Sequence, residues 1–115
     1  MKVFKFGGAS VKDAAGVKNI LGVLRHTGFK DTLIVVSAMG KTTNALEQVV
    51  HSFFKNKKQF PQDLQNVRED HHRIIEDLFG SESAVISQRV NALFDGVLTF
   101  LNMSAPFRTS ERAIS

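Results

Sequence analysis

The first eight residues constrain the fold most, because they join a strand-like run directly to two glycines. Val3 to Phe6 is apolar apart from one lysine, and Gly7 and Gly8 follow at once. A lysine in an otherwise buried strand is costly unless it has a partner. Paired glycines let the chain turn sharply and let a ligand approach the bare backbone. A helical pattern begins near Ser10, and helix N-termini attract anions. This opening therefore predicts a phosphate-binding turn.

The order of the next elements predicts an α/β fold. Apolar residues recur at helical spacing from about Val11 to His26, and Gly28 ends that pattern. Residues 32–36 (TLIVV) form a continuous β-branched run, which is typical of a strand covered on both faces. We therefore expect strands at about residues 2–6 and 32–37, joined as a parallel βαβ unit. Both loops that follow the strands then emerge at one sheet edge, where open α/β folds bind ligands.

The rest of the chain reads as helical. Asn44 is predicted to be the N-cap of a helix, with Glu47 completing a capping box. We divide the chain into a βαβα unit over residues 1–60 and a helical segment over residues 61–115. The segment has one amphipathic helix up to Gly80 and a second that Pro106 interrupts. The apolar stripe of the second helix predicts an antiparallel helix pair; its members are Ile86, Val90, Leu93, Val97 and Phe100.

Composition narrows the function classes. No apolar run approaches the length of a membrane span, so we expect no membrane partner. The chain has no cysteine and no signal-peptide pattern, which fits a cytoplasmic protein. The net charge of +4 is partly concentrated at Lys55, Lys57 and Lys58, which we interpret as a solvated loop. The ten phenylalanines fall mostly on core-facing helical positions, so we expect packing rather than base stacking and no nucleic-acid partner.

Two local motifs suggest a phosphate-binding loop and a metal site, but each has a simpler interpretation. Residues 40–42 read Gly-Lys-Thr, but a P-loop needs a glycine five positions before its Gly-Lys pair, and that position is Val35. His71 and His72 are adjacent, so on a helix their side chains point about 100° apart and do not share one metal ion. We therefore expect one histidine at the core edge and one exposed, and no metal site.

Two segments together resemble the aspartate kinases, a family of the amino acid kinase fold. Residues 5–11 (KFGGASV) are similar to the KFGGTSV-type signature that opens these enzymes. Residues 35–46 (VVSAMGKTTNAL) resemble their second signature, including the serine after the strand and the Thr-Asn pair. The resemblance covers about the first fifty residues, and the order of the two motifs makes it specific. The helical remainder is compatible with the family's helical insertion.

The resemblance implies a fold and a reaction. The fold is a three-layer α/β/α sandwich, of which this chain would form part. The reaction transfers the γ-phosphoryl group of ATP, accompanied by Mg²⁺, to the side-chain carboxylate of L-aspartate, as the first step toward lysine, threonine and methionine. Lys5 would be the catalytic lysine. Lys5, Phe6, Gly7 and Gly8 would bind the nucleotide phosphate, and Ser37, Ala38 and Thr43 would line the aspartate site. Taken without the resemblance, Ser37 and Thr43 are better explained as helix-capping residues.

The chain also departs from the family pattern. Ala9 stands where the family usually has threonine or serine, which removes a hydroxyl beside the phosphate. The family's next signature, a Gly-Glu pair, would fall beyond Ser115. We therefore expect an N-terminal part of a kinase domain that is inactive alone and that self-associates into a homo-oligomer, because missing sheet neighbours leave apolar surfaces uncovered. Two alternatives stay open: another amino acid kinase, such as a carbamate or glutamate kinase, and a non-catalytic helical interaction module.

Overall fold

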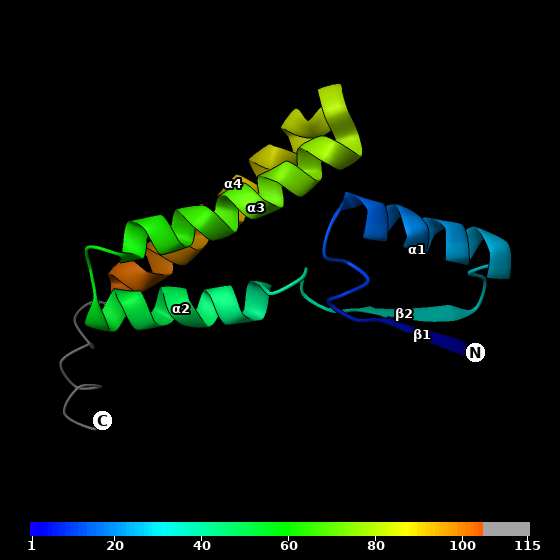
Figure 1. Cartoon of the computed structure of the whole chain (residues 1–115), viewed down its shortest axis with the longest axis horizontal. Helices are drawn as coiled ribbons and strands as arrows, with labels where there is room; N and C mark the ends of the chain where they lie inside the picture. Colours follow the sequence, from blue (N-terminus) through cyan, green and yellow to red (C-terminus); the bar gives the residue numbers. More distant parts are fainter. Residues whose placement is uncertain (105–115) are drawn as a thin grey trace.

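The computed structural model describes residues 1–104, and the part of the expected helical segment that includes Pro106 lies outside them. Strand β1 spans Lys2–Phe6, helix α1 Ala14–Thr27 and strand β2 Thr32–Val36. Helices α2 (Thr42–Lys55), α3 (Phe60–Phe79) and α4 (Ser83–Ser104) follow, with a 3₁₀ turn, η1 (Gly80–Glu82), between α3 and α4. The first three elements form one end of the molecule, and the three long helices form the other (Figure 1).

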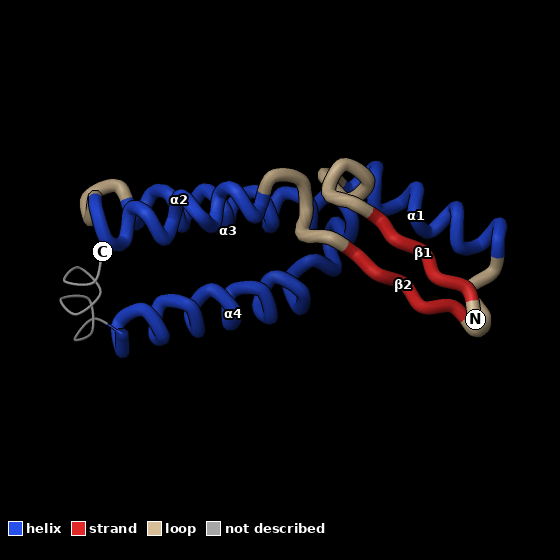
Figure 2. The backbone as a smooth tube through the Cα atoms, turned by 90° about the horizontal axis from the view of Figure 1, so that it is seen from below, coloured by secondary structure: helices blue, strands red, loops and turns tan. Residues whose placement is uncertain are grey.

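The βαβ unit has the predicted parallel pairing. Lys2 pairs with Thr32 and Phe6 with Val36, so the two strands end side by side (Figure 2). α1 lies over one face of this two-stranded sheet (Figure 1). Phe4 and Phe6 are half-buried with ring centroids 6.3 Å apart, whereas Lys5 is exposed. Since side chains alternate along a strand, Lys5 lies on the face away from those rings.

The prediction that β2 is covered on both faces is wrong for the described chain. Its four apolar residues after Thr32 are between 39% and 56% exposed. With only two strands and one helix against them, one sheet face has no covering layer among the described residues. An apolar run of this kind therefore indicates a strand that is suited to burial, without showing that the covering elements lie in the same 104 residues.

The helix boundaries are close to those predicted, with two corrections. α1 begins at Ala14 rather than near Val11, because Asp13 caps it by accepting from the Gly16 N–H at 2.8 Å. α2 begins at Thr42, so Asn44 is not its N-cap. Both the N–H and the hydroxyl of Thr42 donate to the Met39 carbonyl, and this turn starts the helix three residues earlier, with Lys41 as its N-cap.

The main core lies among the three long helices. Val49 of α2 packs with Leu64 and Val67 of α3, and all three are at least 95% buried. Half-buried hydrophobic residues surround this cluster: Ala45, Phe60, Phe94 and Leu98. α3 and α4 form a helical hairpin, as predicted.

Only the first part of the predicted stripe of α4, Ile86 and Val90, is half-buried. Phe94 and Leu98 lie against the core cluster, whereas Leu93, Val97 and Phe100 are 72%, 42% and 67% exposed. Two polar side chains of α3 decide this rotation, because the Asn91 side-chain oxygen accepts from Arg68 Nη1 at 3.1 Å and lies 2.9 Å from His72 Nε2. Apolar spacing alone could not distinguish the two faces, since α4 is apolar on both.

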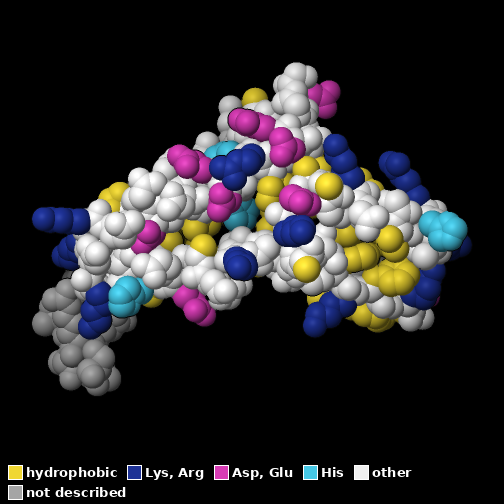
Figure 3. All heavy atoms as spheres, viewed as in Figure 1, with side chains coloured by type: hydrophobic (Ala, Val, Ile, Leu, Met, Phe, Trp, Pro, Cys, Tyr) yellow, Lys and Arg dark blue, Asp and Glu magenta, His cyan; other side chains and the backbone are white. Residues whose placement is uncertain are grey.

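Outside this core, hydrophobic side chains are exposed at the end formed by α1 and the sheet (Figure 3). Phe29, Phe79 and Phe100 are more than 40% exposed, whereas the other six phenylalanines of residues 1–104 are buried or half-buried, as expected if most of them serve in packing. The lysines at 57 and 58 lie in the exposed turn between α2 and α3, as predicted. No helix among residues 1–104 is both long and apolar enough to cross a membrane.

Candidate functional site

The loops that follow β1 and β2 lie in contact at the carboxyl edge of the sheet. The Ser37 N–H donates to the Phe6 carbonyl at 2.9 Å, which extends the strand pairing by one residue. Further along, the Gly40 N–H donates to the Gly8 carbonyl at 3.2 Å. The parallel register therefore places these two loops, which are about 30 positions apart in the sequence, together at the carboxyl edge of the sheet, which we call the rim.

Neighbouring backbone atoms leave no room for a side chain at residue 8, so a glycine is required there. A Cβ at residue 8 would lie 2.9 Å from the Gly40 carbonyl oxygen and 3.5 Å from that of Ala38. Of the three glycines at the rim, only Gly40 has a positive φ, of 52°. Gly7 has nothing within 4 Å of the position that its Cβ would take, so the space beside it is open. The close backbone approach is therefore at Gly8 alone, and the second loop makes it.

The backbone at the end of β1 keeps free donors. In residues 1–104 the N–H groups of Gly7 and Gly8 have no backbone acceptor, although their carbonyls accept from Ser10, Val11 and Gly40. Lys5 is exposed, and its ammonium group has no ion-pair partner in the same range. Free N–H groups next to an unpaired cation are suited to bind an anionic oxygen.

The second loop presents two hydroxyl groups in different settings. Ser37 is exposed, and its Oγ donates to the Ala38 carbonyl at 3.2 Å while retaining its lone pairs. Thr43 is exposed in the first turn of α2, after the Met39–Thr42 segment in the sequence. The described hydrogen bonds give Thr43 Oγ1 no role in capping, so a capping function does not explain its hydroxyl.

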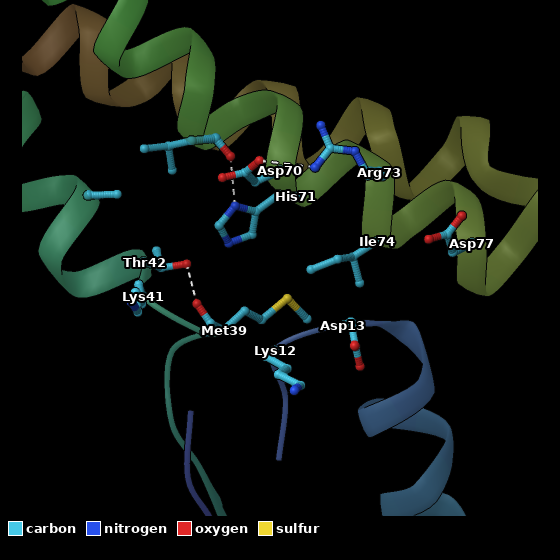
Figure 4. Close-up of a pocket in the computed structure, with 13 residues that line it drawn as sticks. Lys12, Asp13, Met39, Lys41, Thr42, Asp70, His71, Arg73, Ile74 and Asp77 are labelled. Carbon is cyan, nitrogen blue, oxygen red and sulfur yellow. Dashed lines mark hydrogen bonds and ion pairs between the residues drawn. The ribbon is translucent and has the colours of Figure 1, made fainter. Parts of the chain in front are cut away.

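A cavity of about 360 Å³ lies next to this rim, and no sequence pattern pointed to it (Figure 4). The start of α1, the Met39–Thr42 segment and helix α3 form its walls. The predicted site residues are absent from its lining, which instead includes Lys12, Met39, Thr42, His71 and Ile74. The sequence analysis did not predict this group of cavity-lining residues. Its members on α3 lie about 30 positions after the Met39–Thr42 segment that they face.

The two histidines of α3 are both half-buried, so the prediction that one is exposed is wrong. His72 faces α4 through Asn91, whereas the His71 ring points into the cavity (Figure 4). Asp70 pairs with Arg73 at 3.3 Å on the exposed side of α3. Within residues 1–104 no three His, Cys, Asp or Glu side chains cluster in a way that could hold a metal ion.

Comparisons with known proteins place the chain near one family. It is 35% identical over 95 positions to "Aspartokinase 2, chloroplastic" of Arabidopsis thaliana, an alignment that covers 79% of this chain and 17% of that protein. It is 29% identical over 119 aligned positions to "Aspartokinase 1, chloroplastic" of the same plant, covering 98% of this chain and 20% of that protein.

A third similar protein is "Bifunctional aspartokinase/homoserine dehydrogenase 1, chloroplastic" of Arabidopsis thaliana, at 30% identity over 90 positions, covering 77% of this chain and 10% of that protein. No family model and no solved structure matches the chain. The chain spans a fifth or less of the length of these three relatives. Because all three alignments cover most of its residues, the chain is related to the aspartokinases.

Proposed function

We propose that this chain supplies part of an aspartate kinase, which transfers the γ-phosphoryl group of ATP to the side-chain carboxylate of L-aspartate and yields 4-phospho-L-aspartate. The relation to aspartokinases supports the reaction class. The observation that carries the proposal is the contact between the two loops, with the Gly40 N–H donating to the Gly8 carbonyl. It brings the lysine–glycine segment and the serine-led segment to one rim, where two substrates can meet.

In this proposal the end of β1 binds the transferred phosphoryl group. Phosphoryl transfer needs positioning and neutralisation of charge on the phosphoryl oxygens more than covalent help from the protein. The Lys5 ammonium group supplies a point charge, and the free N–H groups of Gly7 and Gly8 supply fixed dipoles. The open space beside Gly7 fits a phosphate group. Phe6 holds this segment in register through its pairing with Val36.

The loop after β2 binds the acceptor in the same proposal. L-aspartate carries an ammonium group and two carboxylates, which need hydroxyl and backbone partners. Ser37 and Thr43 offer exposed hydroxyls, and Ala38 lies between them at the rim. Mg²⁺ would arrive with the nucleotide, with phosphate oxygens among its ligands, which is its usual mode of binding in kinases.

We propose further that the 115-residue chain does not turn over alone, because it spans a fifth or less of its relatives. An assay of the isolated chain with ATP, Mg²⁺ and L-aspartate is expected to form no acyl phosphate. Turnover at about 1 s⁻¹ or more, which is usual for kinases, would overturn this proposal.

Acceptor recognition can be tested on the chain itself. Titration of the ¹⁵N-labelled chain with L-aspartate is expected to shift the amide signals of Ser37, Ala38 and Thr43, and L-glutamate is expected to do so more weakly. Thr43→Val should weaken binding about two- to tenfold, since one hydrogen bond is lost. Thr99→Val is the matched control, because Thr99 lies on α4 and donates to Asp95. Failure of L-aspartate to move these amides, or equal affinities of the two variants, would contradict the assignment.

One observation favours the helical interaction module as a second candidate. Leu93 and Phe100 of α4 are 72% and 67% exposed on a helix that also has a packed apolar face. Leu93→Gln, which leaves the core residues Phe94 and Leu98 of α4 in place, separates the two functions. A kinase fragment keeps its L-aspartate-induced shifts at Ser37, whereas an interaction module loses its partner.

A further inference from the structure

His71 has a fixed orientation in the cavity beside the rim. Its Nδ1 lies 2.8 Å from the Val67 carbonyl oxygen, which can only accept, so Nδ1 carries the proton in this contact. Its ring meets Phe94 of α4 edge-on, with centroids 6.3 Å apart. Held on these two sides, the ring points its Nε2 into the cavity, toward the Met39–Thr42 segment (Figure 4).

The opposite wall of the cavity is the segment that separates the proposed aspartate-binding residues. Met39–Thr42 follows Ser37 and Ala38 and precedes Thr43. It is fastened to the βαβ unit by the Gly40–Gly8 hydrogen bond and closed on itself by the bond from Thr42 Oγ1 to the Met39 carbonyl. No hydrogen bond joins it directly to α3 among residues 1–104. Any polar link from α3 to this segment therefore has to cross the cavity.

The cavity has the size and the polar groups needed for ordered water. A volume of about 360 Å³ exceeds that of a single water molecule many times. Nε2 of His71 on one wall faces Thr42 and the loop backbone on the other, and Met39 and Ile74 add apolar surface between them (Figure 4). Water that bridges two polar groups links them almost as well as a direct hydrogen bond does.

We infer that His71 is a positioning residue for the acceptor-binding loop, linked through cavity water to the Met39–Thr42 segment. The inference rests on the proposed function for the role of that loop in binding aspartate. By holding the segment between Ser37 and Thr43, His71 sets the separation of the two hydroxyls that face the acceptor. Helix α3, which contributes no predicted site residue, would thereby influence acceptor affinity.

His72 shows what a purely structural histidine looks like on the same helix. Its Nε2 lies 2.9 Å from the Asn91 side-chain oxygen, so it joins α3 to α4 and has no place in the cavity lining. His71→Gln and His72→Gln are therefore matched variants. Both replace a half-buried histidine of α3 by a residue with good helix propensity, and only the first removes a ring from the cavity.

The link can be measured by NMR without any catalytic activity. The charged groups that line the cavity with His71 are Lys12, Asp13, Lys41, Asp70, Arg73 and Asp77. The amides of Gly40, Lys41 and Thr42 are expected to titrate with the midpoint of the His71 ring. This titration should vanish in His71→Gln and persist in His72→Gln.

Titration of these amides in His71→Gln, or its absence from the unmodified chain, would overturn the inference. The affinity for L-aspartate is a second measurement. His71→Gln should weaken this affinity about two- to tenfold, and His72→Gln should leave it unchanged. If L-aspartate moves Ser37 and Thr43 equally in both variants, the role of His71 fails while the proposed function stands. If L-aspartate moves neither residue, the proposed function fails and the pH titration still tests the link. Far-ultraviolet circular dichroism confirms that each variant is folded.

Discussion

Gly8 lies against the turn that follows β2, and this contact makes it the most constrained residue of the rim. Its Cβ would approach the Gly40 carbonyl oxygen to 2.9 Å, and that atom belongs to backbone that is itself hydrogen-bonded to Gly8. We expect Gly8→Ala to separate the loops and lower the free energy of unfolding by about 1–3 kcal/mol. Gly7→Ala meets nothing within 4 Å and should change stability by less than about 0.5 kcal/mol. Urea denaturation measures the free energy of unfolding of both variants, and equal values would contradict the contact.

Two glycines of α1 give a second matched pair. A Cβ at Gly16 would overlap the Ser10 carbonyl oxygen, whereas a Cβ at Gly22 would meet nothing within 4 Å. Gly22→Ala should stabilise the chain by about 0.5–1 kcal/mol, since alanine has the better helix propensity. Gly16→Ala should destabilise it, because the turn before α1 must move. Thermal unfolding followed by circular dichroism measures both, and a gain in stability for Gly16→Ala would show that this turn does not pack against the helix.

At the scale of elements, a polar cluster fastens α2 to α3. Ser52 is fully buried, and its hydroxyl donates to the Asp63 carboxylate, which also accepts from Gln59 at 3.0 Å and Gln48 at 3.3 Å. These hydrogen bonds lower the pKa of Asp63 below its usual value, and the bond from Ser52 contributes most. A lowered pKa in the folded state means that ionised Asp63 stabilises the fold above its unfolded pKa of about 3.9. This contribution is lost as the pH falls through the folded value.

We therefore expect Ser52→Ala to raise the pKa of Asp63 and to flatten the pH dependence of stability below about pH 5. The measurement is the carboxyl ¹³C shift of Asp63 from pH 6 to pH 2, together with urea denaturation at pH 7 and pH 3. Ser87→Ala, which changes a half-buried serine of α4, is the control. An unchanged Asp63 pKa in Ser52→Ala would show that the Ser52 hydroxyl does not cause the shift.

Local patterns predicted most of these elements, and long-range contacts explain the rest. The strands, their parallel pairing and the α3–α4 hairpin followed from apolar periodicity and glycine positions. The start of α2 was misplaced because Asn44 is a good cap by type, while the turn at Met39 closes first. The packed face of α4 was misjudged after Val90 because Asn91, a polar residue, fixes the rotation. The rim was predicted from the two loops. The position of His71 beside the rim was not predicted, because α3 approaches the rim only in the tertiary structure.

At the scale of the whole molecule, the described chain is extended and incompletely covered. Its radius of gyration is 17.5 Å, compared with about 13 Å expected for a compact domain of this size. Exposed apolar residues lie on β2 and on α4. Such surfaces promote association. We therefore expect sedimentation velocity to show self-association of the isolated chain that increases with concentration.

The substitution Leu93→Gln should reduce this association, since the Leu93 side chain is 72% exposed on α4. Phe29→Gln, which changes a residue 65% exposed at the other end of the molecule, is the control for a general loss of hydrophobic surface. A chain that remains monomeric at high concentration would contradict the expectation, as would an equal effect of the control.

The most direct test of the rim is the response of its glycine amides to a non-hydrolysable ATP analogue with Mg²⁺. We predict saturable shifts of the Gly7 and Gly8 amide signals, with smaller shifts at Ser37, since the two loops are in contact. Lys5→Met should abolish these shifts, and Lys18→Met, which alters an exposed lysine of α1, should leave them intact. Glycine amides that stay unmoved at saturating analogue, or that shift equally in Lys5→Met, would contradict a phosphate site at this rim.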